Sequence, residues 1–415
     1  MNATATPPRI SEGQFFWLVT ASVVAGGLYL WPTPLLVAAG PDAPIALLGA
    51  GLLGALLVVT AFAWGGRVRG RALFDRLERL WGPFAWGWMV GSGCLFLVLD
   101  GALLALYVGM LVAFFFPGTP PWVLGLLLAT MAFLLARKPA DTLARNIGLW
   151  LVLALLGFFA LAATALATAD AHAPGLSALR PAWPPSAGGV LRGIGATWFL
   201  VFDAGAAALT FAPAVHARGR AGVRNHALFA LLFQVGMLAV VAVLALTLLG
   251  PWASRSQLWP VVQLMVGVGP TSGSFLRPSL IILPVWTAAF ISYLAVRIHG
   301  VSVNTAAVLA PGQGGRAWHA LVLTAGVLAI AWRAPPLPAL LPEVVDVLGP
   351  IALVWSVALH TLSFVLAAVR AGPPDGVRRR RDRAPTEDAA AATAPVTASP
   401  AAPPGPAGRP DRRPA

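Results

Sequence analysis

Cysteine and lysine are almost missing from this chain of 415 residues. The only cysteine is Cys94, within an apolar run, so the sequence excludes an internal disulfide framework and a zinc cluster built on cysteines. The only lysine, Lys138, lies between two apolar runs. No lysine is therefore available within a membrane span to stand in for a metal cation.

Charged residues are scarce as well, at 10% of the chain against 58% hydrophobic residues. This composition, with a mean hydropathy of +0.79, indicates an integral membrane protein. The net charge of +13 does not indicate nucleic-acid binding, because the positive residues gather in short loops and in the final segment. The N-terminal stretch has no charged region leading into a short apolar run, so we expect no removable signal peptide.

Patterns typical of enzymes are also absent. The sequence contains no phosphate-binding loop of the Walker type, no HExxH and no paired-carboxylate hydrolase pattern. These absences argue against an ATP-driven pump and an intramembrane metalloprotease. We expect no enzymatic activity, no metal site and no cofactor.

Long apolar runs are abundant, and we count ten that are long enough to cross about 30 Å of hydrocarbon. Arginine is concentrated in alternate loops, which places both termini in the cytoplasm. We predict a short cytoplasmic N-terminus (1–11), a ten-helix membrane domain (12–370) and a disordered basic tail rich in alanine and proline (371–415). The predicted spans are 14–38, 43–65, 86–115, 121–137, 146–168, 190–213, 226–250, 279–302, 318–333 and 348–370.

Ten spans divide into five plus five, so the second half enters the membrane with the opposite orientation. That is the condition for an inverted-topology repeat, in which corresponding helices of the two halves are interrupted at the substrate site. The predicted fold class is therefore an all-α polytopic membrane protein with a five-plus-five inverted repeat of the LeuT type. Helices 1 and 6 are expected to be broken.

The first span carries residues that weaken a helix at mid-membrane. Ala25, Gly26 and Gly27 are small and permissive, and Pro32 and Pro34 remove backbone donors. Backbone groups left unpaired at this depth are tolerated only where they face a cavity or protein. We therefore predict that the ligand binds at Ala25, Gly26 and Gly27.

The sixth span repeats this pattern in LVFDAGAAALTFAP. Phe202, Asp203 and Gly205 are its candidate binding residues, and Pro213 follows. Three roles are open to Asp203: binding a substrate ammonium, carrying a coupling proton, or capping a half-helix. For Gly205, close helix packing through small residues is an equal alternative.

Other polar residues at membrane depth are few, and each is a functional candidate because burial of an ionisable group is costly. Asp100 lies in the third span, and Tyr107 is placed to offer it a hydroxyl group; Tyr293 is a further candidate in the eighth span. We expect Arg297 to extend towards the cytoplasmic interface in a structural role, and His360 to be a packing residue.

One family resembles this sequence over about residues 9–370. RISEGQFFWLVTASVVAGGLYLWPTPLLVAAGPD resembles the opening of the spore germination permeases, the B subunits of germinant receptors, in its I-S-x-x-Q stretch (Ile10, Ser11, Gln14) and its G-x-D (Gly40, Asp42). Ser11 and Gln14 also form the pattern of a capping box. The sixth span and SQLWPVVQLMVGVG resemble later motifs of the family, except that Asp203 stands where a glutamate is more usual.

The resemblance implies a subunit in the inner membrane of a bacterial endospore, of the amino acid, polyamine and organocation transporter superfamily. It would bind a small nutrient such as an amino acid and act with an A subunit and a lipoprotein C subunit. Two alternatives remain open: a secondary amino acid permease driven by protons or sodium, and a structural subunit whose site binds nothing. Lipid is the remaining expected partner, and no nucleic acid is expected.

Overall fold

The computed structural model describes residues 10–23, 32–68, 70, 72–167, 175, 185–215, 220–256, 259, 262, 278–309 and 313–371. Within these ranges all regular secondary structure is helical, apart from one isolated β-bridge that joins Ile10 to Val215. The expected all-α fold is confirmed for this part of the chain. By internal contacts the chain divides into two units, Met1–Arg370 and Ala371–Ala415. The tail predicted at 371–415 lies almost entirely outside the described residues and stays a prediction.

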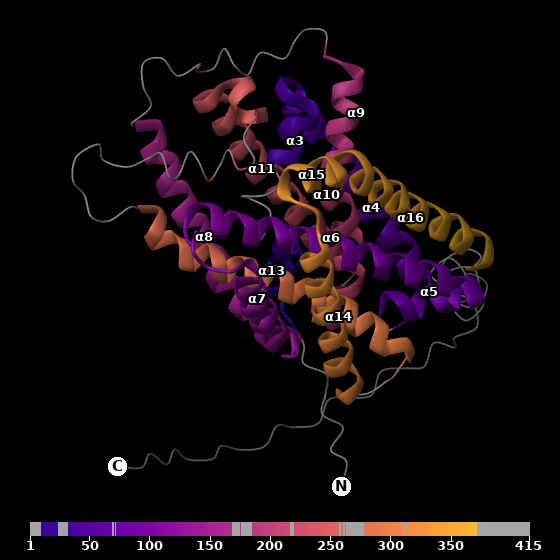
Figure 1. Cartoon of the computed structure of the whole chain (residues 1–415). Helices are drawn as coiled ribbons and strands as arrows, with labels where there is room; N and C mark the ends of the chain where they lie inside the picture. Colours follow the sequence, from indigo (N-terminus) through magenta and orange to yellow (C-terminus); the bar gives the residue numbers. More distant parts are fainter. Residues whose placement is uncertain are drawn as a thin grey trace, which may run out of the picture. The chain divides into compact units, whose positions relative to one another are not determined.

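The helices follow the predicted apolar runs closely (Figure 1). Those of the first half are α1 (Glu12–Ala21), α3 (Pro32–Ala39), α4 (Ala43–Arg67), α5 (Leu73–Trp81), α6 (Ala85–Phe114), α7 (Pro121–Ala136) and α8 (Ala140–Ala167). Those of the second half are α9 (Ala187–Ala196), α10 (Trp198–Phe211), α11 (Arg220–Ser256), α13 (Pro278–Leu309), α14 (Gln313–Arg333), α15 (Leu337–Pro342) and α16 (Gly349–Ala371).

Five stretches of the described chain are long and apolar enough to cross a membrane: Pro32–Arg67, Leu73–Phe114, Ala140–Thr164, Ala221–Gly250 and Pro338–Arg370. Pro121–Ala136 and Gly205–Ala214 are shorter apolar helices. The count of ten spans stays a prediction. The segment around Arg76, expected as a loop, instead contains α5, an amphipathic helix that buries Leu73, Phe74, Leu77 and Leu80.

The predicted capping box at the start of α1 is confirmed. The backbone N–H of Ser11 donates to Gln14 Oε1 over 2.8 Å, and the backbone N–H of Gln14 donates to Ser11 Oγ over 3.2 Å. The residue before this cap is joined to the short 3-10 helix Ala212–Ala214 that follows α10, because Ile10 N–H donates to the Ala214 carbonyl over 2.9 Å. The beginning of the first span therefore lies beside the end of the sixth.

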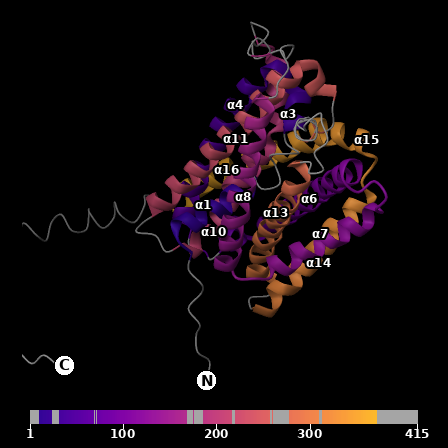
Figure 2. The same cartoon turned by 90° about the vertical axis from the view of Figure 1, so that its left-hand side faces the viewer.

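Packing between the two halves is reciprocal. α1 packs against α11 and α10 packs against α4; α3 packs against α11 and α9 against α4; α6 packs against α14 and α13 against α7. Each of these six contacts thus has a counterpart made by the corresponding helices of the other half. Figure 2 shows α6, α7, α13 and α14 grouped together, apart from α3, α4 and α11. Reciprocal packing of this kind is expected of an inverted repeat.

α9 approaches both α3 and α4 closely because it presents a glycine at the contact. A Cβ added to Gly193 would lie 2.5 Å from Ala46 Cβ and 2.7 Å from Ala39 Cβ. Asp42 fixes the start of α9, since its Oδ2 accepts the backbone N–H of Ser186 over 3.2 Å. Its negative charge is also favourable beside a helix N-terminus.

The expectation that the sixth span opens at Asp203 and Gly205 is wrong. Both residues lie inside α10, and the interruption between α9 and α10 falls at Thr197. There the Thr197 hydroxyl donates to the carbonyls of Gly193 and Ile194 over 3.0 and 2.9 Å, a local bond that competes with continuation of a helix. The break expected at Ala25, Gly26 and Gly27 lies outside the described residues.

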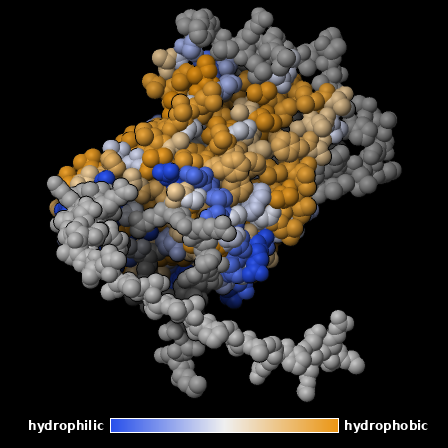
Figure 3. Space-filling model, turned by 180° about the vertical axis from the view of Figure 1, so that it is seen from behind, coloured by the Kyte–Doolittle hydropathy of each residue, from blue (hydrophilic) through white to orange (hydrophobic). Residues whose placement is uncertain are grey.

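Large apolar side chains are exposed along the outer helices. On α4, Leu48, Leu52 and Leu56 follow one another at helical spacing and are 63%, 75% and 61% exposed. Figure 3 shows hydrophobic side chains over most of one face of the molecule, with hydrophilic ones gathered below. A surface of this size and composition is expected to face lipid.

The α3–α9 contact yields a prediction about two glycines of one helix. We expect Gly193→Ala to lower the unfolding free energy by about 1–3 kcal/mol, because the new methyl group overlaps two alanines. Gly188→Ala is the matched control, since its Cβ would meet only Ser186 Oγ at 3.9 Å and alanine favours a helix. Thermal unfolding in detergent measures both. Equal stability of the two variants would contradict the close packing.

Candidate functional site

A buried ion pair joins α6 to α13. Arg297 Nε donates to Asp100 Oδ1 over 2.5 Å, and the two side chains are 3% and 0% exposed. Either charge alone in this apolar environment would cost several kcal/mol, because no partner would compensate for its lost hydration. The pair therefore requires α6 and α13 to keep their register.

Aromatic side chains complete the surroundings of this pair. The Tyr293 hydroxyl donates to Asp100 Oδ1 over 3.2 Å. The Arg297 guanidinium lies 5.4 Å from the centroid of the Tyr293 ring and 5.8 Å from that of Phe96, both favourable cation–π distances. Helical spacing brings these groups together, because Tyr293 lies one turn before Arg297 and Phe96 one turn before Asp100.

The expectation that Arg297 extends to the membrane interface is wrong. α13 continues to Leu309, and twelve further residues at 1.5 Å each place Arg297 about 18 Å from that end. This distance exceeds the reach of an arginine side chain. Arg297 instead turns inward to Asp100.

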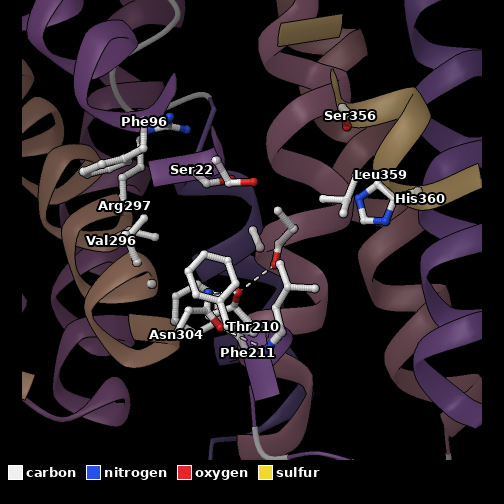
Figure 4. Close-up of a pocket in the computed structure, with 17 residues that line it drawn as sticks. Ser22, Phe96, Thr210, Phe211, Val296, Arg297, Asn304, Ser356, Leu359 and His360 are labelled. Atoms are coloured by element: carbon white, nitrogen blue, oxygen red, sulfur yellow. Dashed lines mark hydrogen bonds between the residues drawn. The ribbon is translucent and has the colours of Figure 1, made fainter. Parts of the chain in front are cut away.

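A cavity lies against Arg297 and is lined by residues of five helices and by Ser22, which directly follows α1 (Figure 4). The space in it that is open to the centre of a water-sized molecule is about 80 Å³. Arg297 and Phe96 lie on one side of it, and His360, Leu359 and Ser356 on the opposite side. The contributing helices are α5, α6, α10, α13 and α16. Both halves of the chain therefore contact anything bound there.

Asn304 organises one end of the cavity. Its Oδ1 accepts the backbone N–H of Leu73 over 2.9 Å, and its Nδ2 donates to Thr210 Oγ1 over 2.9 Å. Thr210 in turn donates to the carbonyl of Ala206 over 2.8 Å. Three elements, α5, α13 and α10, are held together in this way, so α5 closes that end of the cavity with Leu73 and Phe74.

Ser22, directly after α1, also lines the cavity. Its hydroxyl donates to the carbonyl of Val19 over 2.7 Å. Gln234 of α11 donates to the same carbonyl over 2.7 Å, which holds the end of α1 from the other side. The predicted binding residues Ala25, Gly26 and Gly27 follow Ser22 in the chain but lie outside the described residues.

The structure brings only some of the predicted residues together. Asp100 and Tyr293 meet in the ion-pair cluster. Tyr107 does not reach Asp100, because its hydroxyl donates to Thr287 Oγ1 over 3.2 Å and its ring stacks on Phe290 at 3.9 Å. Gly205 lies beside His360. The side chains of Phe202 and Asp203 lie outside the described residues.

None of the predicted binding residues is among the described residues that line the cavity. Its polar side chains, which were not predicted as binding residues, are Ser22, Ser92, Thr210, Arg297, Asn304, Ser356 and His360. His360 is buried, as expected, and its Nδ1 accepts the indole N–H of Trp64 over 3.4 Å. The available sequence signal is the occurrence of polar residues within apolar runs. It marks candidate residues but does not show which of them line the same cavity. Among the described residues, no three histidine, cysteine or acidic side chains gather as a potential metal site.

The ion pair yields a double-mutant prediction. We expect Asp100→Leu and Arg297→Met each to lower the unfolding free energy by about 3–5 kcal/mol, because each leaves one buried charge unpaired. The double variant should lose much less than the sum of the two. Arg79→Met is the control, since Arg79 is 58% exposed and its pair with Asp75 contributes about 1 kcal/mol or less. If thermal unfolding shows the Asp100→Leu and Arg297→Met variants to be as stable as this control, the account of a buried charge pair is contradicted.

Comparison with known proteins identifies the family. A family model described as Spore germination protein matches residues 9–332. Among solved structures, the chain resembles MhsT in complex with L-phenylalanine, a LeuT-fold protein, with a TM-score of 0.61 and 14% identity. The likeness covers 88% of this chain and 99% of MhsT, and it establishes the fold. No curated protein matches. The chain is an all-α membrane protein with a LeuT-like fold, and it belongs to the spore germination protein family.

Proposed function

We propose that this chain is the membrane subunit of a spore germinant receptor and that it binds a small amino acid in the cavity beside Arg297. The observation that carries this proposal is the cavity itself, which contains a buried cationic side chain and is shared by both halves of the fold. The family match supports the role in germination. The likeness to a protein solved with L-phenylalanine supports an amino acid as the class of ligand.

The chemistry of the wall fits the carboxylate of such a ligand. A guanidinium carries five N–H donors in a rigid fork, so Arg297 is able to serve both Asp100 and a ligand carboxylate. Ser22 also lines the cavity, and the small residues Ala25, Gly26 and Gly27 follow it in the chain. We assign the ligand backbone to this side of the cavity, which extends from the end of α1 to Arg297.

Ligand occupancy would act through the contacts between the two halves. The cavity wall includes Ser22 and α6 from the first half and α10, α13 and α16 from the second. A ligand that contacts both sets shifts the population towards the conformation in which both contacts exist, by no more than its difference in affinity for the states. The A and C subunits would receive this change at the spore inner membrane, with both chain termini in the cytoplasm.

A second candidate function, secondary amino acid permease, is favoured by the likeness to MhsT. Uptake of labelled amino acids into proteoliposomes, measured beside germination of a deletion strain, separates the two. A receptor subunit predicts a germination defect without concentrative uptake. Robust concentrative uptake together with normal germination of the deletion strain would contradict the receptor function and support the permease function.

Filling the cavity tests the site. We expect Ala207→Trp to reduce the germination response to amino acids at least tenfold, because the indole occupies the space beside Thr210. Leu232→Trp, on a lipid-facing position of α11 that is 67% exposed, is the matched control and should respond normally. Loss of spore refractility measures the response, and immunoblots of spore membranes measure the amount of protein. A normal response by Ala207→Trp at normal abundance would exclude this cavity as the binding site.

A further inference from the structure

His360 is the most conspicuous unexplained group in the cavity wall. Its side chain, on α16, is 1% exposed and lies opposite Arg297 (Figure 4). Among the described residues, its Nε2 has no hydrogen-bond partner. Buried polar atoms are nearly always paired, so an unpaired one that borders a cavity calls for an acceptor or donor that enters from outside.

The contact with Trp64 determines which kind of partner is required. An indole N–H is a donor only, so His360 Nδ1, at 3.4 Å from Trp64 Nε1, must act as the acceptor. A ring whose Nδ1 is an acceptor carries its proton on Nε2. The unpaired atom is therefore an N–H donor, and the partner that it requires is an oxygen or nitrogen acceptor.

Gly205 lies against this edge of the ring. A Cβ at this position would lie 2.8 Å from Nε2 and 3.3 Å from each of the two adjacent ring carbons. Any larger side chain at Gly205 would displace the imidazole, so this glycine lets the ring keep its place in the cavity wall between α16 and α10. The next residues along α10, Ala206 and Ala207, line the cavity, so the unpaired donor lies at its border.

We propose that His360 is a ligand-binding residue whose Nε2–H donates to an oxygen on the side chain of the bound amino acid. Arg297 takes the carboxylate on one side of the cavity, and His360 takes a hydroxyl or amide oxygen on the other. The class of ligand is therefore a small polar amino acid. This assignment rests on the proposed function, because it requires an amino acid in the cavity.

Isosteric ligand pairs test the assignment directly. L-Threonine has a hydroxyl group where L-valine has a methyl group. L-Asparagine has a carboxamide group where L-leucine has an isopropyl group. We expect the purified full-length protein to bind the oxygen-bearing member of each pair about five- to tenfold more tightly, the effect of one hydrogen bond. Equilibrium binding of the four labelled amino acids gives these ratios.

Variants of the histidine then assign the preference to one atom. His360→Leu should bring both ratios to about one while binding of valine and leucine persists. His360→Gln, which retains an N–H donor, should keep part of the preference and also guards against a folding defect of the leucine variant. His226→Leu, at a partly exposed histidine of α11, is the control and should leave the ratios unchanged.

Two failures remain distinguishable. If the wild-type protein binds none of the four amino acids or others of the standard set, the proposed function fails, and the assignment of His360 fails with it. If amino acids bind but the ratios are near one in the wild-type protein, or survive in His360→Leu, only the role of His360 is overturned.

Discussion

The charge pair of Asp100 and Arg297 is the constraint on which the centre of this protein depends. Neither charge is tolerable alone in an apolar interior, and the pair satisfies both by joining the third and eighth predicted spans. Replacing such a pair by apolar residues is often neutral for stability, so its value here lies in fixing register and in presenting a cation to the cavity. The Tyr293 hydroxyl donates to Asp100, and the rings of Tyr293 and Phe96 hold the Arg297 guanidinium in place.

Reciprocal packing of the two halves places the cavity beside Arg297. α1 against α11 and α10 against α4 bring the beginning of the first span to the end of the sixth, where Ile10 bonds to Ala214. Asn304 then joins α13 to α10 and to α5, and Trp64 joins α4 to α16. The cavity wall is thus assembled by contacts between residues distant in sequence. A substitution at Trp64, which does not line the cavity, would change the shape of the cavity through His360.

The sequence predicted where the long helices lie but not the directions in which their side chains point. Apolar run length predicted the long apolar helices, since length and hydropathy reflect the membrane thickness, but it missed the amphipathic α5. Ser11 and Gln14 were predictable because a capping box is local. Arg297 was misplaced because hydropathy gives depth but not the face of a helix, and its partner lies 197 residues away. Asp203 was taken to open a helix that continues through it, since glycine and small residues also serve close packing.

One measurement addresses the central claim that an amino acid binds in the cavity between Arg297 and His360. A structure of the full-length protein, determined with a bound amino acid that elicits germination, would show where the ligand lies. The account predicts ligand density within the cavity, with the carboxylate within hydrogen-bond distance of Arg297. Ligand density elsewhere, such as in the apolar groove beside Trp122 and Trp332, with the cavity empty, would contradict it.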